Sequence, residues 1–393
     1  MALQYQYIKI YGRFFCLQQN PAMFAWVLFL KKDTFYDTFY TKFKRKQTKF
    51  QPWTVSWIKY NVCSFINKLK IVIYFIACQL KLKKNDNKIN LPVYGHLGVS
   101  VHKGYKIFDL RRGVVTKVFN KDNNKSIILS EIEQLEKVSK IPFASSIRGW
   151  SIEERLYEED YINGSLDSRI SRDSATLLKK FYHDIAPCLD SLILFQKPMI
   201  HNAIEYINEM IKISKVSRLS RQRLTAGEFN KIQSFIDSVS EDFRGVGNCS
   251  VYLVFTHGDF CPANMLNTRK GIRIIDWESA GNRSALFDFY SYFFFHPVSR
   301  KVPVNTLISE INEALPCFIS KLAEKAPDIS KNLLALASVY RWLYYVERIS
   351  MLLERQMTDT NLNILNYISR YIDVFNSYEE VLRASTGKGE PVK

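Results

Sequence analysis

The stretch that decides the fold is HGDFCPAN, residues 257–264, and Asp276 follows twelve positions after its last residue, within IIDWE, residues 274–278. From average residue usage, about one chain in a thousand of this length would contain such an H-G-D-x-x-x-x-N by chance. A carboxylate at Asp259 on a tight loop could accept a proton from an attacking hydroxyl. Asn264 and Asp276, joined by a predicted hairpin, supply hard oxygen atoms suited to Mg²⁺ with bound phosphates.

Two other residues of this loop allow different chemistry. A histidine can bind a metal or transfer protons, but beside Gly258 on a tight turn we expect His257 to support the loop backbone through hydrogen bonds. Cys261 could serve as a nucleophile, yet the sequence places no base to activate its thiol. We therefore predict structural roles for both.

These residues resemble the aminoglycoside phosphotransferase and choline kinase-like superfamily, small-molecule relatives of the protein kinases. Its catalytic loop reads H-G-D-x-x-x-x-N, its metal aspartate lies in I-D-[WF]-E, and the resemblance covers about Leu91 to the C-terminus. It implies an enzyme, a phosphotransferase with an alcohol group as acceptor, using ATP and Mg²⁺. By this resemblance Asp259 is the catalytic base or orients the hydroxyl, Asn264 and Asp276 bind Mg²⁺, and His257 supports the loop.

The resemblance also implies nucleotide-binding residues nearer the N-terminus. Lys117, in VVTKV, would contact the α- and β-phosphates, and Glu131 on a following helix would hold that lysine, with Glu133 as the alternative. An ordinary strand-edge lysine and a solvated glutamate remain the other interpretation. Tyr161 lies in a stretch that resembles the family's lobe linker, whose backbone would pair with adenine.

One departure from the family pattern affects the phosphates. There is no G-x-G-x-x-G loop, so the backbone of Gly104, with Lys103, would have to cover them. A shortened cover keeps a pseudokinase or nucleotide-binding scaffold open as an alternative. A protein kinase-like enzyme is a further alternative, although H-G-D replaces H-R-D. Asp288, in LFDF, is similar to a downstream family aspartate, and we expect it to brace the structure.

The hydrophobic pattern predicts an α+β fold. Period-2 alternation with turns predicts an antiparallel meander over residues 97–119, followed by a helix over 126–140. After Gly164 the pattern is mostly helical, with a short strand at 251–255 and a hairpin at 265–275. With the resemblance, this predicts a two-lobed protein kinase-like fold. Its parts are a basic, aromatic-rich N-terminal segment (residues 1–90), an antiparallel-sheet N-lobe with hinge (91–164) and a larger helical C-lobe with the catalytic loop and substrate site (165–393).

Composition separates the first 90 residues from the rest. The 393-residue chain carries a net charge of +17, and residues 1–90, with 16 Lys or Arg and 3 Asp or Glu, hold +13 of it. We consider three interpretations: a small helical subdomain with its own core, peripheral contact with an anionic membrane, and, least favoured, nucleic-acid contact. The apolar runs at residues 22–30 and 71–80 are about half the ~20 residues that span a bilayer.

Cysteine usage predicts the compartment. The seven cysteines are scattered without C-x-x-C spacing, which fits neither a zinc site nor a disulfide framework. The N-terminus lacks the charged and apolar regions of a secretory signal. We expect a cytoplasmic protein, with peripheral contact at the inner face of the cytoplasmic membrane as a second possibility.

The acceptor is the least constrained prediction. Lys212, Lys215, Arg218, Arg221 and Arg223 lie within a dozen positions, which disfavours a polycationic aminoglycoside. A solvated basic helix face is one interpretation, and attraction to a phosphorylated or carboxylated sugar is the other. With the basic N-terminal segment, this favours a sugar or glycolipid hydroxyl, as in cell-envelope polysaccharide assembly.

Overall fold

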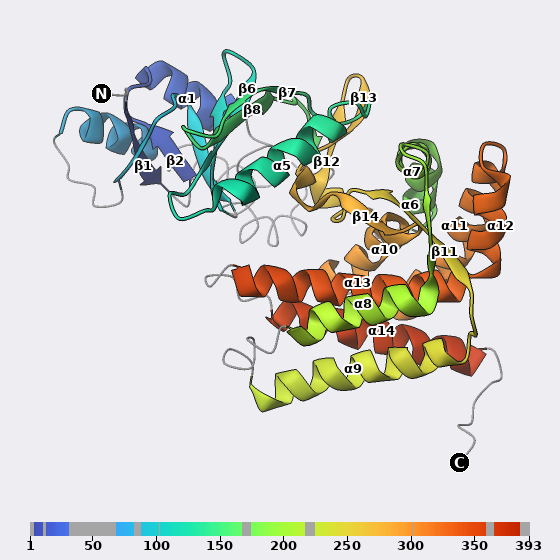
Figure 1. Ribbon diagram of the computed structural model, residues 1–393. Helices are drawn as coiled ribbons and strands as arrows, with labels where there is room; N and C mark the ends of the chain where they lie inside the picture. Colours follow the sequence, from blue (N-terminus) through green and yellow to red (C-terminus); the bar gives the residue numbers. More distant parts are fainter. Residues whose placement is uncertain are drawn as a thin grey trace, which may run out of the picture. The chain divides into compact units, whose positions relative to one another are not determined.

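The computed structural model describes residues 4–10, 13–30, 68–81, 88–101, 103–166, 174–216, 225–300, 302–358 and 365–385. It divides into two compact units (Figure 1), the first formed by Met1–Leu166 with Met265–Ile275 and the second by Asp167–Asn264 with Asp276–Lys393. The basic and aromatic clusters predicted within residues 31–67 lie outside the described residues.

The first unit is built around an eight-stranded antiparallel sheet in the order β3-β1-β2-β4-β5-β6-β8-β7. The predicted meander is present as β4, β5 and β6. The strands are β1 (Tyr5–Ile10), β2 (Arg13–Cys16), β3 (Lys88–Leu91), β4 (Leu97–Val101), β5 (Gly104–Asp109), β6 (Val114–Phe119), β7 (Ile147–Ser151) and β8 (Leu156–Asp160).

Helix α5 (Lys125–Val138) follows the meander, close to the predicted range. It begins where the Asn124 side chain accepts a hydrogen bond from the backbone N–H of Ser126, which satisfies one of the unpaired donors at a helix start. Its buried residues recur at the three- and four-residue spacing of an amphipathic helix, and Glu131 is among them. The sequence therefore places a carboxylate on the buried side of this helix.

The N-terminal strands correct the predicted boundary near residue 90. β1 pairs with β2 on one side and with β3 on the other. β2 in turn pairs with β4 through Phe14 and Phe15. The described part of the basic N-terminal segment is thus built into the sheet of the predicted N-lobe. Charge and aromatic counts separate the two stretches, but strand pairing across some 80 positions does not show in such counts.

Two N-terminal helices share a core with these strands. α1 (Pro21–Leu30) and a helix over residues 68–79 bury Phe24 and Phe75, whose rings stack at 3.9 Å between centroids. Ile8, Phe15 and Leu97 of the sheet join the same cluster. Among the described helices, none is both long enough and apolar enough to cross a membrane.

The second unit is mostly helical, as predicted, around a three-stranded sheet in the order β10-β11-β14. Its helices are α6 (Ser174–Lys180), the π-helical turn η1 (Phe181–Ile185), α7 (Ala186–Ile193), α8 (Ala203–Val216), α9 (Ala226–Arg244), α10 (Phe287–Arg300), α11 (Val304–Ala323), α12 (Pro327–Ala335), α13 (Ala337–Thr358) and α14 (Leu365–Ser385). Its strands are β10 (Met199–Asn202), β11 (Ser250–Thr256) and β14 (Gly281–Ser284). Residues 332–356 belong to two helices, α12 and α13, because the backbone leaves the helical region at Leu336.

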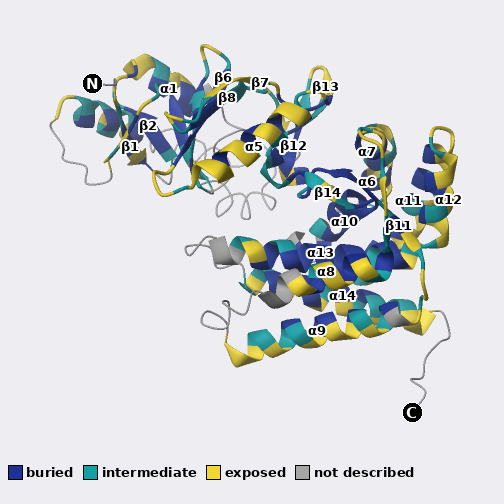
Figure 2. Ribbon diagram, in the orientation of Figure 1, coloured by how far each residue is buried: buried dark blue, intermediate teal, exposed yellow. Residues whose placement is uncertain are grey.

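Between β11 and β14 the chain contributes a hairpin to the first unit. The predicted hairpin is formed by β12 (Met265–Thr268) and β13 (Gly271–Ile274), and β9 (Ser165–Leu166) pairs with β12. Figure 2 shows the buried residues of both units, including those of α10, α13 and α14. Aromatic rings from these three helices contact one another in the core of the second unit. In that core Tyr345 and Phe375 stack at 4.1 Å.

The N-terminal core gives a stability prediction. Phe75→Ala should lower the free energy of unfolding by about 3–5 kcal/mol, because it removes a fully buried ring and leaves a cavity. Leu80→Ala, at the exposed end of the same helical segment, should change it by less than about 0.5 kcal/mol. Urea unfolding measures both, and equal effects would show that residues 68–79 do not pack on the sheet.

Candidate active site

The predicted catalytic loop leaves the end of β11 through a backbone conformation that glycine suits. Gly258 has φ of +80°, and a Cβ atom there would lie 2.1 Å from the carbonyl oxygen of Ser279. No side chain fits at that distance, and L-residues rarely adopt this conformation. Gly258 therefore allows the loop to pack directly against the turn that carries Asp276.

Asp288, near the start of α10, fixes the same loop. Its carboxylate accepts hydrogen bonds from the backbone N–H groups of His257, at 2.6 Å, and Gly258, at 3.1 Å. Burial raises the pKa of Asp288 to about 7, while the two N–H donors and Arg283 act to lower it. This geometry is that of the brace predicted from the sequence.

Asp259 and Asn264 lie side by side in the loop. The amide nitrogen of Asn264 donates to the carboxylate of Asp259 at 3.2 Å and to its backbone carbonyl at 2.9 Å. About a fifth of the Asp259 side chain is exposed to solvent. The aspartate is thus held in one orientation while one side of it stays open to another molecule.

Arg348 on α13 contacts this aspartate, and the sequence analysis missed it. Its guanidinium donates to the Asp259 carboxylate at 3.0 Å, to the carbonyl of Gly258 at 3.3 Å and to the hydroxyl of Tyr371 at 3.1 Å. Burial acts to raise the pKa of Asp259, but Arg348, Arg355 and His257 outweigh it and hold that pKa below its ordinary value. Asp259 is therefore ionised at neutral pH.

His257 and Cys261 lie where structural roles are expected. His257 is fully buried, and its Nδ1 accepts a hydrogen bond from the backbone N–H of Asp259 at 3.2 Å. Its ring lies edge-on to Trp277, with 4.6 Å between centroids. Burial raises the pKa of the Cys261 thiol to about 12, so the thiolate needed for nucleophilic attack does not form near neutral pH.

Asp276 sits at the start of the short helical turn Trp277–Ser279, directly after β13. Its backbone is left-handed, with φ of 70° and ψ of 55°. This conformation is uncommon for a non-glycine residue and is concentrated at functional sites, where the surrounding structure holds it. The close approach of Ser279 to Gly258 places this turn against the catalytic loop.

In the first unit the predicted lysine and glutamate meet. Lys117 of β6 and Glu131 of α5 form a buried ion pair, with Nζ 2.5 Å from Oε1. Tyr157 donates to the same oxygen at 3.2 Å, and Lys103 lies 3.9 Å from the other. Glu133 is exposed on α5, so Glu131 is the helix residue that contacts Lys117.

The other two predicted nucleotide-binding residues occupy ordered backbone. Gly104 pairs with Phe119, and a Cβ atom on it would lie 2.0 Å from the carbonyl oxygen of Val118, so close strand packing requires glycine there. Tyr161 follows β8, and its N–H donates to the carbonyl of Gly113 at 2.9 Å. Neither contact tests a role toward nucleotide.

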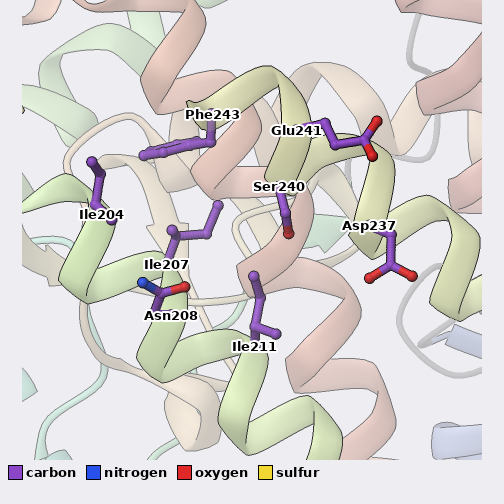
Figure 3. Close-up of a pocket in the computed structure, with 8 residues that line it drawn as sticks. All are labelled: Ile204, Ile207, Asn208, Ile211, Asp237, Ser240, Glu241 and Phe243. Carbon is purple, nitrogen blue, oxygen red and sulfur yellow. The ribbon is translucent and has the colours of Figure 1, made fainter. Parts of the chain in front are cut away.

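A cavity of about 410 Å³ lies elsewhere in the second unit, between α8 and α9. Figure 3 shows isoleucine side chains from α8 and Phe243, Ser240 and two carboxylates from α9 around it. None of the residues that line it belongs to the loop of residues 257–264 or to the turn after Asp276. The cavity is therefore separate from the predicted catalytic group.

Comparison with known families finds a similarity in this region. Residues 217–307, which contain the predicted catalytic loop, Asp276 and Asp288, match the model of the phosphotransferase enzyme family. This segment is similar to a phosphotransferase. The match confirms the predicted resemblance to the aminoglycoside phosphotransferase and choline kinase-like superfamily, and agrees with the prediction of a phosphotransferase. A comparison with curated protein sequences finds no significant match.

The sheet unit and the helical unit confirm the predicted α+β fold of protein kinase-like class. Several solved structures are similar to this chain at low identity. Choline kinase LicA from Streptococcus pneumoniae is 16% identical, with a TM-score of 0.47 over 72% of this chain and 92% of the kinase. A choline kinase from Cryptosporidium parvum is 16% identical, with a TM-score of 0.48 over 69% of this chain and 83% of that kinase. A glucosamine kinase is 12% identical, with a TM-score of 0.43 over 74% of this chain and 78% of that kinase.

Arg348 gives a pH prediction. In Arg348→Met the pKa of Asp259 should rise, because the main lowering charge is removed, so the acid limb of the pH profile for ATP turnover should move to higher pH. Arg348→Lys should restore part of the shift. Arg341→Met, on the same helix as Arg348, breaks the ion pair with Glu379 of α14 and should leave the limb in place. An unmoved limb in Arg348→Met would contradict the assignment.

The buried ion pair gives a second prediction. Glu131→Gln should raise the Michaelis constant for ATP, because Lys117 loses the charge that holds it. It should also destabilise the fold by up to about 3–5 kcal/mol, the range for breaking a buried pair. The exposed Glu133→Gln should change neither quantity in ATP titrations and urea unfolding. The reverse pattern would reject the pairing as the functional one.

Proposed function

We propose that the chain transfers the γ-phosphate of ATP to a hydroxyl group of a small molecule. The observation that carries this proposal is the loop of residues 257–264, in which Asp259 is ionised, oriented by Asn264 and Arg348, and open on one side. A carboxylate in that state can bind a hydroxyl by accepting its hydrogen bond. Phosphoryl transfer depends mainly on such positioning and on electrostatic stabilisation.

The lowered pKa of Asp259 bears on how it would act. A weakly basic carboxylate does not deprotonate a hydroxyl in the ground state. It can accept a hydrogen bond from that hydroxyl and so direct a lone pair of the hydroxyl oxygen toward the phosphate. As the bond to phosphorus forms, the hydroxyl becomes acidic and its proton can pass to Asp259. Arg348 keeps the carboxylate charged until it accepts that proton, and holds it in place throughout.

The residues present fit Mg²⁺. The nitrogen of the Asn264 amide is used by Asp259, and none of the described residues donates a hydrogen bond to the amide oxygen. With the Asp276 carboxylate this offers two hard oxygen ligands, and Mg²⁺ usually takes its other ligands from phosphates and water. No cluster of three or more His, Cys, Asp or Glu side chains suited to a metal occurs among the described residues. When bound, Mg²⁺ would neutralise charge on the phosphates.

Lys117 would serve the nucleotide from the first unit. An ammonium group held by a buried glutamate on a neighbouring helix is the arrangement that protein kinases use to contact the α- and β-phosphates. By the resemblance, Gly104 and the backbone at Tyr161 would contact phosphates and adenine. These roles are proposals that ATP affinity measurements on variants address.

For the acceptor we propose a sugar or glycolipid hydroxyl, as in cell-envelope polysaccharide assembly. The support is the basic stretch that begins at Lys212, which disfavours a polycation, although the side chains after it lie outside the described residues. A screen of sugars, phosphorylated sugars, amino alcohols and lipid-linked glycans tests this choice. Transfer to amino alcohols alone would reject it.

Asp259→Asn tests the proposed reaction. The variant should keep the fold and bind ATP, while phosphate transfer should fall by a factor of about 10²–10⁴, the range for a positioned acid or base group. Asp328→Asn, at an exposed site on α12, should retain full transfer. An Asp259→Asn protein with full activity would remove this residue from the mechanism. Absence of ATP turnover in the unaltered chain would favour the pseudokinase alternative.

A further inference from the structure

The helix over residues 68–79 has two apolar sides. One side, with Ile71, Phe75 and Cys78, is buried in the core shared with the sheet. At about 100° per residue, Leu69 and Ile73 lie on the opposite side, and Leu80 continues that line. Leu69, Ile73 and Leu80 are 45%, 59% and 64% exposed. A surface helix normally carries polar residues on its outer side. This second apolar stripe therefore indicates a surface that contacts another molecule.

The helix cannot rotate to bury that stripe instead. Phe75 stacks on Phe24 of α1, and the side-chain amide of Gln79 donates to the backbone carbonyls of Leu17 and Gln19 at 2.7 and 2.8 Å. These contacts fix which side meets the sheet. The outer side is therefore a constant surface of the first unit.

The described charged residues in this part of the sequence have one sign. Lys70 and Lys81 are exposed at the two ends of the stripe. In the described part of the chain before Leu91, the charged residues are six Lys or Arg, namely Lys9, Arg13, Lys68, Lys70, Lys81 and Lys88, with no Asp or Glu. On α1, which packs beside this helix, Trp26 is 37% exposed. Aliphatic side chains, a tryptophan and lysines in a stretch whose described residues include no Asp or Glu suit the headgroup region of an anionic bilayer.

We propose that the outer face formed by Leu69, Ile73, Leu80, Lys70 and Lys81 docks the protein on an anionic membrane surface. The helix lies along the bilayer, its aliphatic side chains enter the boundary between headgroups and acyl chains, and the lysines meet lipid phosphates. The contact is peripheral and reversible. It would bring an enzyme close to acceptors held in the membrane, but it stands on this face alone and does not require phosphate transfer.

Vesicle sedimentation of the full chain tests the proposal. The protein should sediment with equimolar phosphatidylglycerol and phosphatidylcholine vesicles at about 0.05 M salt, and should be released at about 0.5 M, where the Debye length is much shorter. It should not sediment with phosphatidylcholine alone. Absence from the anionic vesicles at low salt would overturn the proposal.

Matched variants locate the surface. Leu69→Gln with Ile73→Gln should weaken vesicle binding at least about tenfold, and Lys70→Gln with Lys81→Gln about 25-fold, near fivefold per lysine. Leu334→Gln and Lys331→Gln, at exposed positions on α12, should leave binding unchanged. Equal binding by all variants would overturn the assignment.

Size-exclusion chromatography with light scattering examines the competing occupant. We expect the same mass for the unaltered chain and for Leu69→Gln with Ile73→Gln. A dimer that this double variant converts to monomer would show that a second copy covers the face, and would reject the membrane. Thermal unfolding and ATP hydrolysis should match the unaltered chain, since the altered side chains are exposed and lie outside the proposed reaction group.

Discussion

The carboxylate of Asp288 is the point on which the second unit depends. It accepts two backbone N–H groups from consecutive residues, His257 and Gly258, and so sets the direction in which the chain leaves β11. A buried carboxylate is unfavourable unless it has such partners, and a buried N–H without an acceptor is also costly. The two requirements satisfy each other. Asp259, next in sequence, is oriented as a consequence.

Helix α13 connects the loop to strands β11 and β14 through hydrogen bonds. Tyr340 accepts a hydrogen bond from the backbone of β11, Glu347 accepts two from Ser284 of β14, and Arg348 holds the loop. Burial raises the pKa of Glu347, although its hydrogen bonds act to lower it. Three polar residues of one helix thus position both strands and the proposed reaction group. The aromatic packing around Tyr345 and Phe375 keeps that helix in place.

The sequence predicts the parts of this arrangement that depend on local spacing. Asp259 and Asn264 lie five positions apart on one loop, so their proximity follows from local spacing. The resemblance to the kinase-like family implied the pairing of Lys117 with Glu131, which lie on the successive elements β6 and α5. Arg348 contacts Asp259 across 89 positions, and only one signal could have found it. A charged residue in line with Tyr344 and Leu352, four positions to either side, falls on the buried side of an amphipathic helix.

In the first unit, local sequence patterns do not predict the pairing of strands that lie far apart in the sequence. Strand β1 pairs with β3, some 80 positions away. The basic composition of the chain between them does not indicate this pairing. The break between α12 and α13 at Leu336 also lacks a proline or glycine that would predict it. In both cases tertiary packing selects the structure, and local preference does not reveal the choice.

We propose that the shape of the loop at Gly258 positions the reaction group of Asp259 and Asn264. Rates of ATP turnover in Gly258→Ala and Gly247→Ala test this directly, because both glycines have positive φ but only at Gly258 would a Cβ atom meet other atoms. The account predicts a loss of about a hundredfold or more in Gly258→Ala, since displacements near 1 Å at a reacting group have that effect. Gly247→Ala should retain its turnover. Full turnover in a folded Gly258→Ala protein would contradict the account.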